Sequence, residues 1–188
     1  MESSVSLKIW ILIALVFSLM GDVFLMLLED RPDFFMYGLV AFLISHIFYI
    51  IAFSTSVHKP LNIPLFRKYP LTYIIPYAYS AYIFSILKPD LGDLALPVLV
   101  YILVITTMLV VAFNRYGKMN NNSYLWILLG AFLFVTSDSI LALDKFHSNI
   151  EYARYYIMIT YMLAQFFIVK GAVSQVKEQG LFVEKESK

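Results

Sequence analysis

The stretch LALPVLVYILVITTMLVVAF, residues 94–113, decides the fold class of this chain. It contains no charged side chain, and about 20 apolar residues are the length that crosses the hydrocarbon core of a bilayer as an α-helix. A helix satisfies all of its backbone hydrogen bonds internally, which a bilayer demands. The stretch therefore predicts a transmembrane helix.

The composition of the whole chain agrees with this prediction. Of 188 residues, 61% are hydrophobic and 14% are charged, against roughly 45–50% and about 25% in soluble domains. The mean hydropathy is +0.76. A soluble fold of this length cannot bury so much apolar surface, so we expect an integral membrane protein.

The net charge of +1 offers no basic field for nucleic acid. The absence of cysteine excludes disulfides, thiol nucleophiles and thiolate metal sites, and leaves the redox compartment undetermined.

We expect an all-α polytopic transmembrane bundle, because six apolar stretches approach or reach spanning length and none alternates with period two. The expected spans are 7–28, 34–53, 70–87, 94–113, 124–143 and 152–174. They form one membrane domain, residues 1–175, followed by a polar cytosolic tail at 176–188. The third span is the shortest and carries Pro76, which predicts a kink. Because Met1 to Lys8 is short and polar, we expect the first stretch to be retained as a span and not cleaved as a signal peptide.

The distribution of Lys and Arg predicts the orientation. Six spans place both termini on one side, and the cytosolic side carries the excess of positive charge. One side carries Lys8, Lys59, Arg67, Lys68, Arg115, Lys118, Lys170, Lys177, Lys185 and Lys188, and the other carries Arg31, Lys88, Lys145 and Arg154. Both termini are therefore expected in the cytosol.

Two acidic residues, Asp22 and Asp138, fall well inside expected spans. A carboxylate facing lipid costs several kcal/mol, so each should face the interior of the bundle. Each lies roughly 6–7 Å past the middle of its span at 1.5 Å per residue. Both spans run in the same direction, so both carboxyl groups fall in the extracytoplasmic leaflet and are candidates to share one cavity.

Polar neighbours predict a wet pocket around the two carboxyl groups. Ser18 shares a helix face with Asp22, and Gly21 leaves room for a close helix or a ligand. The candidate substrate-binding residues are Ser18, His46, Tyr49, Ser137, Tyr156, Thr160, Tyr161 and Gln165. Structural interpretations stay open: the two aspartates as helix caps or cross-bundle hydrogen bonds, His46 as a buried neutral ring, and the tyrosines as packing or interfacial residues.

The chemistry that these residue types permit is limited. The three histidines form no HxxxH or HxxE pair, so no protein metal site is predicted. No GxSxG elbow or glycine-rich phosphate loop occurs. Two nearby carboxyl groups in a low dielectric do not both ionise easily, which provides an acid and a base in one site. That pair suits proton transfer to an apolar substrate, and it equally suits a proton-coupled carrier.

Four motifs in register resemble the YhhN-like family of membrane proteins, whose characterised members are lysoplasmalogenases. They are SLMGDVFLML at 18–27, GLVAFLISHIFYI at 38–50, GAFLFVTSDS at 130–139 followed by LALDKF at 141–146, and TYMLAQ at 160–165. The resemblance covers about residues 15–170. On this pattern Asp22 and Asp138 match the intramembrane aspartates of the family.

The resemblance implies a reaction and a substrate. The enzymes hydrolyse the vinyl ether bond of lysoplasmalogens with water, and release a fatty aldehyde and glycerophospho-ethanolamine or -choline. One aspartate would be the general acid, with Asp138 favoured, and the other would stabilise the cation and activate water. No metal or organic cofactor is implied. The expected membrane is the endoplasmic reticulum in a eukaryote and the inner membrane in a bacterium.

The resemblance also implies a difference in length. Family members have about eight spans, so two spans are expected to be missing before Ser6. The alternatives are a shorter active bundle, an inactive truncated relative, and a proton-coupled carrier or lipid-binding membrane protein. Oligomeric state is not predicted.

Overall fold

The computed structural model describes residues 2–27, 33–55 and 69–186, and side chains within 5–178 of this range. Within it the chain is helical, as the apolar stretches predict. The helices are α1 (Glu2–Met26), α2 (Phe34–Thr55), α4 (Leu71–Leu87), α5 (Ala95–Phe113), α6 (Asn121–Phe146) and α7 (Ala153–Glu186), with 3₁₀ turns η1 (Lys88–Asp90) and η2 (Gly92–Leu94) between α4 and α5. The all-α bundle is thus confirmed.

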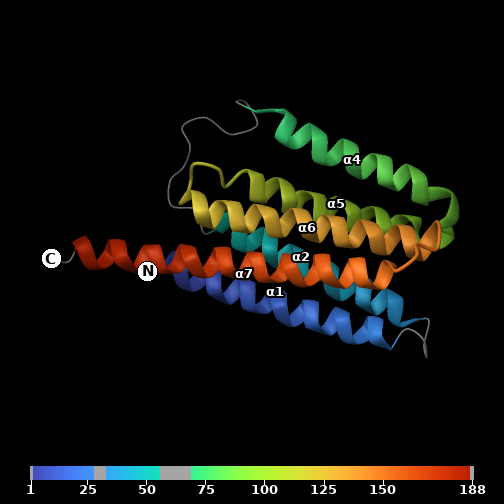
Figure 1. Cartoon of the computed structure of the whole chain (residues 1–188), viewed down its shortest axis with the longest axis horizontal. Helices are drawn as coiled ribbons and strands as arrows, with labels where there is room; N and C mark the ends of the chain where they lie inside the picture. Colours follow the sequence, from blue (N-terminus) through green and yellow to red (C-terminus); the bar gives the residue numbers. More distant parts are fainter. Residues whose placement is uncertain (1, 28–32, 56–68, 187–188) are drawn as a thin grey trace.

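Five of these helices are long and apolar enough to cross a membrane, and α4 is the exception. At 17 residues, α4 is at the lower limit for a span. It continues through Pro76 and lies along α5 at the edge of the bundle. Successive helices alternate in direction, so both ends of the chain lie at the same end of the bundle (Figure 1).

The boundaries differ most at the last helix. The polar tail was expected to begin at residue 176, but α7 continues to Glu186. Lys, Glu and Gln are good helix formers, and no proline interrupts this segment. Whether residues 176–188 lie in the cytosol stays a prediction. Leu28, and the positive charges at Arg31, Lys59, Arg67, Lys68 and Lys188, lie outside the described residues.

The bundle is built from two closely packed helix pairs, α1 with α2 and α6 with α7, and α5 contacts both α2 and α6. Glycines bring α6 and α7 together. A Cβ atom on Gly130 would lie 2.8 Å from the Ala164 carbonyl oxygen, and one on Gly171 would lie 2.9 Å from that of Ser123. Small residues at such positions allow two helix backbones to approach within the membrane.

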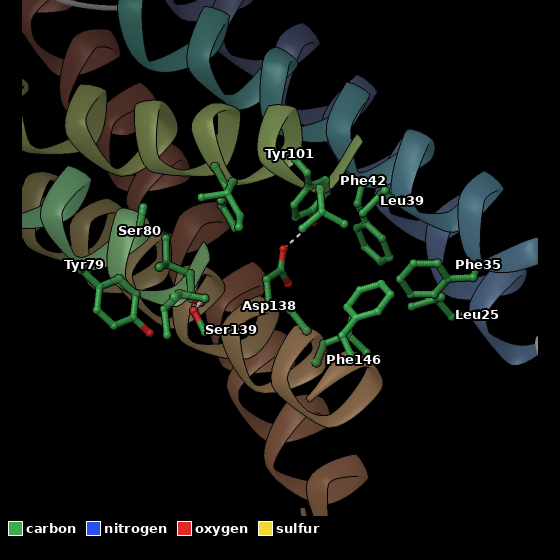
Figure 2. Close-up of a pocket in the computed structure, with 17 residues that line it drawn as sticks. Leu25, Phe35, Leu39, Phe42, Tyr79, Ser80, Tyr101, Asp138, Ser139 and Phe146 are labelled. Atoms are coloured by element: carbon green, nitrogen blue, oxygen red, sulfur yellow. Dashed lines mark hydrogen bonds between the residues drawn. The ribbon is translucent and has the colours of Figure 1, made fainter. Parts of the chain in front are cut away.

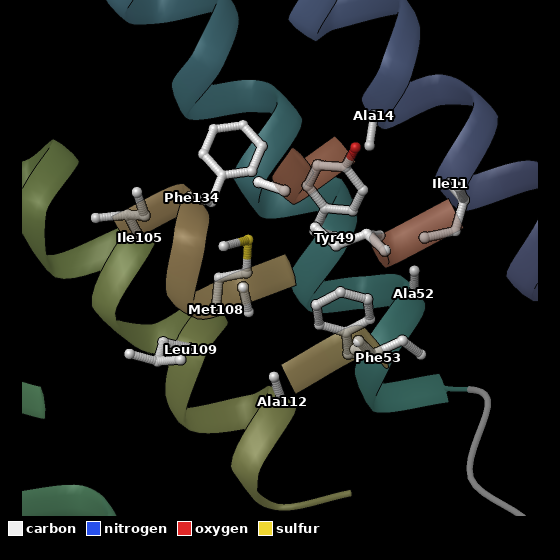
Figure 3. Close-up of a cluster of buried hydrophobic side chains, with 14 of the residues drawn as sticks. Ile11, Ala14, Tyr49, Ala52, Phe53, Ile105, Met108, Leu109, Ala112 and Phe134 are labelled. Atoms are coloured by element: carbon white, nitrogen blue, oxygen red, sulfur yellow. The ribbon is translucent and has the colours of Figure 1, made fainter. Parts of the chain in front are cut away.

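The main core lies where α1, α2, α5, α6 and α7 meet. Its centre includes the fully buried Tyr49, Phe53, Met108 and Phe134 (Figure 3). A smaller apolar cluster joins α4 to α5 and includes Ile83, Leu87, Leu91 and Val98. The two clusters leave a space beside α4 that the site described below occupies.

The outer surface is apolar, as a bilayer requires. Leu12, Leu19, Leu96 and Met162 have exposed fractions of 61–69%. Exposed apolar faces of this extent on successive helices are typical of contact with lipid. Together with the five long apolar helices, they establish an integral membrane protein.

One buried charge joins three segments at the end of the bundle that holds the termini. Arg115 follows α5 and is 1% exposed. Its guanidinium donates to the Phe53 carbonyl near the end of α2 and to Gln175 Oε1 on α7, the latter at 2.6 Å. Burial lowers the pKa of Arg115 to about 9, which leaves it charged at neutral pH. The guanidinium thus caps α2 and ties it to α7.

Candidate functional site

A cavity of about 60 Å³ lies between α2, α4, α5 and α6 (Figure 2). Its walls are mostly apolar, and Leu25 of α1 contributes at one end. The polar groups in the wall come from Tyr79, Ser80, Tyr101, Asp138 and Ser139. A cavity of this size and polarity has room for water, and the apolar walls suit a hydrocarbon chain.

Asp138 carries the acidic group of this cavity. It lies on α6, and its side chain is 14% exposed. The Tyr101 hydroxyl on α5 donates a hydrogen bond to Asp138 Oδ2 (Figure 2). His46 Nε2 lies 3.9 Å from the same oxygen, beyond direct hydrogen-bonding distance. Because both neighbours approach Oδ2, the other carboxylate oxygen is left for a ligand.

His46 is enclosed by aromatic rings. It is fully buried on α2, with ring centroids 4.6 Å from Phe134 and 5.4 Å from Tyr101. Both contacts are edge-to-face, an arrangement that aromatic rings favour. His46 therefore supports one side of Tyr101, which in turn contacts Asp138.

Asp22 belongs to a second polar group, formed by α1, α2 and α7. The Tyr161 hydroxyl donates to Asp22 Oδ2 at 2.8 Å. Gln165 Nε2 donates to the Tyr161 oxygen at 3.2 Å, and the Tyr49 hydroxyl donates to Gln165 Oε1. The bonds form a continuous line of donors from Tyr49 to the carboxylate, which fixes the orientation of Asp22.

The two carboxyl groups do not share the cavity. Asp138 lines it and Asp22 does not. The Phe42 ring lines the cavity, packs edge-to-face on Tyr161 and occupies the space above Gly21. Gly21 thus makes room for this ring. The expectation of one common cavity is therefore wrong. It rested on the depth of each aspartate in the membrane, and depth does not reveal whether an aromatic ring lies between two side chains.

The remaining candidates lie in three different settings. Ser18 is buried and shares a 2.7 Å hydrogen bond with Ser45, which donates to the Ala14 carbonyl. Ser137 is buried and donates to the Ile157 carbonyl across the α6–α7 contact. Thr160 donates to carbonyls of its own helix. Tyr156 is 53% exposed on the surface of α7.

Sequence reasoning missed Tyr101 and Phe42, the two residues that define the surroundings of Asp138. Tyr101 is one of 14 tyrosines, and it lies in the middle of an apolar span with no polar neighbour beside it. Phe42 is one of 16 phenylalanines. In the sequence, these two residues are marked only by their place in a motif or an apolar span. Such a place does not reveal the direction in which a side chain points.

The chemistry of the site rests on oxygen and nitrogen groups of the chain itself. Within the residues that the structure describes, no cluster of three or more His, Asp or Glu residues is placed to hold a metal ion. The arrangement offers two carboxyl groups, each hydrogen-bonded to a tyrosine, one beside a largely apolar cavity. Such a site can exchange protons with an apolar ligand away from bulk water.

These features define a class of protein: a polytopic helical membrane protein with a carboxyl-based site inside the bundle. The chain belongs to the YhhN family, whose model matches residues 1–172, so the expected family membership is confirmed.

Similar curated proteins include lysoplasmalogenase TMEM86B of Mus musculus, 33% identical over 85% of this chain, and lysoplasmalogenase TMEM86A of Bos taurus, 32% identical over 87%. TMEM86B of Homo sapiens is 34% identical over 85% of the chain. The matches cover 62%, 65% and 62% of those relatives, so the chain spans somewhat less than two thirds of their length. No solved structure matches the chain.

Proposed function

We propose that this protein is a membrane-embedded hydrolase that cleaves the vinyl ether bond of lysoplasmalogens. The observation that carries the proposal is Asp138, hydrogen-bonded to Tyr101 at the wall of an apolar cavity. The similar curated proteins are lysoplasmalogenases, and their activity supplies the reaction. The cavity supplies surroundings that suit a lipid chain, and Asp138 supplies an acid beside it.

The proposed first step is protonation of the substrate. Protonated Asp138 transfers its proton to the β-carbon of the vinyl ether, and the electron pair of the double bond forms the new C–H bond. An oxocarbenium ion and the Asp138 carboxylate result. The Tyr101 hydroxyl then stabilises this carboxylate through its hydrogen bond.

The second step adds water. Asp22 stabilises the cation and takes a proton from the water that attacks the α-carbon, giving a hemiacetal. Asp22 then gives this proton to the glycerol oxygen while the Asp138 carboxylate takes the proton of the hemiacetal hydroxyl. The C–O bond to glycerol breaks, which releases the fatty aldehyde and glycerophospho-ethanolamine or -choline and returns both carboxyl groups to their starting states. The Phe42 ring lines the cavity and packs against Gly21 and Tyr161, the neighbours of Asp22. In the proposed step this ring rotates aside when substrate binds. The roles of the two carboxyl groups are exchanged if Asp22 is the acid.

The test is aldehyde release from a lysoplasmalogen by the purified protein in detergent. Asp138→Asn and Asp22→Asn should each lower kcat by at least about a hundredfold, the lower end for removal of an acid–base group. Asp93→Asn is the control, because Asp93 is exposed in η2, far along the chain from both groups. Gel filtration verifies that each variant remains folded.

Two results would contradict the proposal in different ways. Activity that survives either substitution would exclude the acid–base roles. No activity from a folded parent protein would exclude the hydrolase function of this chain and favour the carrier alternative. Uptake of the same lipid into sealed vesicles without aldehyde formation would then distinguish a carrier from an inactive relative.

A further inference from the structure

One exposed lysine, Lys145, lies beside an aromatic ring of the cavity wall, near the start of α2 and the end of α6. Lys145 Nζ lies 5.4 Å from the centroid of the Phe35 ring. Phe35 packs edge-to-face on Phe146, and both rings line the cavity (Figure 2). The other cation–ring contacts of the described residues involve Phe53, Trp126 and Phe166, which do not line it.

The position of Lys145 along α6 relates it to Asp138. The two residues are seven positions apart, which is two turns and about 10 Å along the axis. Residues at this spacing lie on the same face of a helix. A ligand that touches Asp138 and extends along α6 toward the end of the bundle therefore meets the Lys145 ammonium.

We propose that Lys145 binds the phosphate of a lysophospholipid whose hydrocarbon chain occupies the cavity. This inference rests on the proposed function and names the site for the head group of that substrate. A phosphodiester carries one negative charge, and a flexible ammonium is a suitable partner for it. Contact with the Phe35 ring holds the ammonium near the cavity end.

The dimensions of the substrate agree with this placement. Seven bonds separate the β-carbon of the vinyl ether from the phosphorus atom, and an extended chain advances about 1.2 Å per bond, so they span about 8 Å. With the β-carbon at Asp138, the phosphate reaches the last turn of α6. The hydrocarbon chain then lies toward Ser80 and Ile105, inside the bundle. The head group lies at the membrane surface, as it does in a bilayer.

The nearby acidic groups are engaged elsewhere. The Asp144 carboxylate accepts a hydrogen bond from the Ile150 N–H at 2.8 Å. Asp90 Oδ2 lies 3.1 Å from His147 Nδ1. Within the described part of the chain, Lys145 forms no ion pair with either, so its charge is available to an anionic ligand.

The experiment measures binding to the full chain in neutral detergent, with two saturated ethers that the enzyme cannot hydrolyse. One is 1-O-hexadecyl-glycerophosphoethanolamine, and the other is 1-O-hexadecylglycerol, which lacks the phosphate. The parent protein should bind the first about tenfold more tightly, which corresponds to about 1.4 kcal/mol. Lys145→Gln should abolish this preference, and Lys145→Arg should keep it.

Lys170→Gln is the matched control. Lys170 also lies over an aromatic ring, 3.7 Å from the Trp126 centroid, but on α7 and away from the cavity. This variant should retain the preference for the phosphate-bearing ether. A preference that survives Lys145→Gln, that is lost equally in Lys170→Gln, or that is absent from the parent overturns the proposal. Binding needs no turnover, so failure of the hydrolase assay leaves this result interpretable.

Discussion

At the scale of single residues, the surroundings of the two aspartates differ. Asp138 contacts a tyrosine hydroxyl beside a cavity, and Asp22 ends a line of hydrogen bonds that includes Gln165 and Tyr49. Hydrogen-bond donors favour the ionised carboxylate, and apolar surroundings favour the neutral acid. These opposing effects suit a group that gives up a proton and must then be stabilised.

The first residue-scale prediction concerns Tyr101, a positioning residue for Asp138. Tyr101→Phe keeps the ring beside His46 but removes the donor to Asp138 Oδ2. A hydrogen bond to a charged group contributes roughly 1.5–3 kcal/mol, so kcat should fall by about tenfold to a hundredfold with little change in KM. The pH–rate profile should also shift to higher pH, because the ionised Asp138 carboxylate loses the hydrogen bond from Tyr101 that stabilises it.

Steady-state kinetics from pH 5 to 9, a range of about two units on either side of neutrality, provides the measurement. Tyr82→Phe is the control, since Tyr82 is 63% exposed on α4. An unshifted pH profile with reduced thermal stability would mean that Tyr101 serves packing alone.

At the scale of helices, the contact between α6 and α7 holds together the helices that carry Asp138 and Tyr161. Asp138 lies on α6 and Tyr161 lies on α7, and the paired glycines set how closely these helices approach. The contact at Gly130 is with backbone atoms of α7, which cannot move aside as a flexible side chain can. A larger residue there must separate the helices.

Gly130→Ile is therefore expected to destabilise the bundle. Overpacking of a close contact costs about 1–3 kcal/mol, and it should appear as a lower midpoint of thermal unfolding in detergent. Leu129→Ile introduces the same residue at the neighbouring position, which is 41% exposed, and should leave the midpoint nearly unchanged. Equal midpoints for both variants would contradict a tight α6–α7 contact.

At the scale of the whole molecule, the alternating helices put both termini at one end of the bundle (Figure 1). Lys8, Arg115, Lys118, Lys170, Lys177 and Lys185 belong to that half, whereas Lys88, Lys145 and Arg154 lie toward the other end. The excess of positive charge near the termini favours a cytosolic location for this end. The proposed head-group site at Lys145 then faces the extracytoplasmic side.

Orientation is testable because the chain has no cysteine of its own. Single cysteines are introduced by Asn121→Cys at the start of α6 and by Ser148→Cys after its end, both at exposed positions. In sealed vesicles with the cytosolic face outward, an impermeant maleimide should label the first variant at once. It should label the second only after the membrane is permeabilised. The reverse pattern would invert the orientation, and immediate labelling of both would contradict a membrane crossing by α6.

The apolar stretches and the two isolated aspartates were enough to predict a helical membrane bundle with acidic groups in its interior. Apolarity over about 20 residues is a local property, and lipid cannot solvate backbone groups, so each stretch becomes a helix whatever its neighbours are. The motifs around Asp22, His46, Asp138 and Tyr161 likewise predicted the family. The C-terminal end of α7 was less accurate, because helix ends depend on capping and interfacial contacts.

Only the tertiary structure decided which side chains meet. Tyr101 faces Asp138, Phe42 lies between the cavity and Tyr161, and Tyr156 points outward, because the rotation and crossing of packed helices set these contacts. Neither the rotation of a helix nor its crossing angle with a neighbour is encoded in the hydropathy of that helix. The sequence by itself therefore determined that the chain lies in a lipid bilayer, which segments are helical, and that two acidic residues lie within the membrane. Packing among all the helices determined which acid lines the cavity.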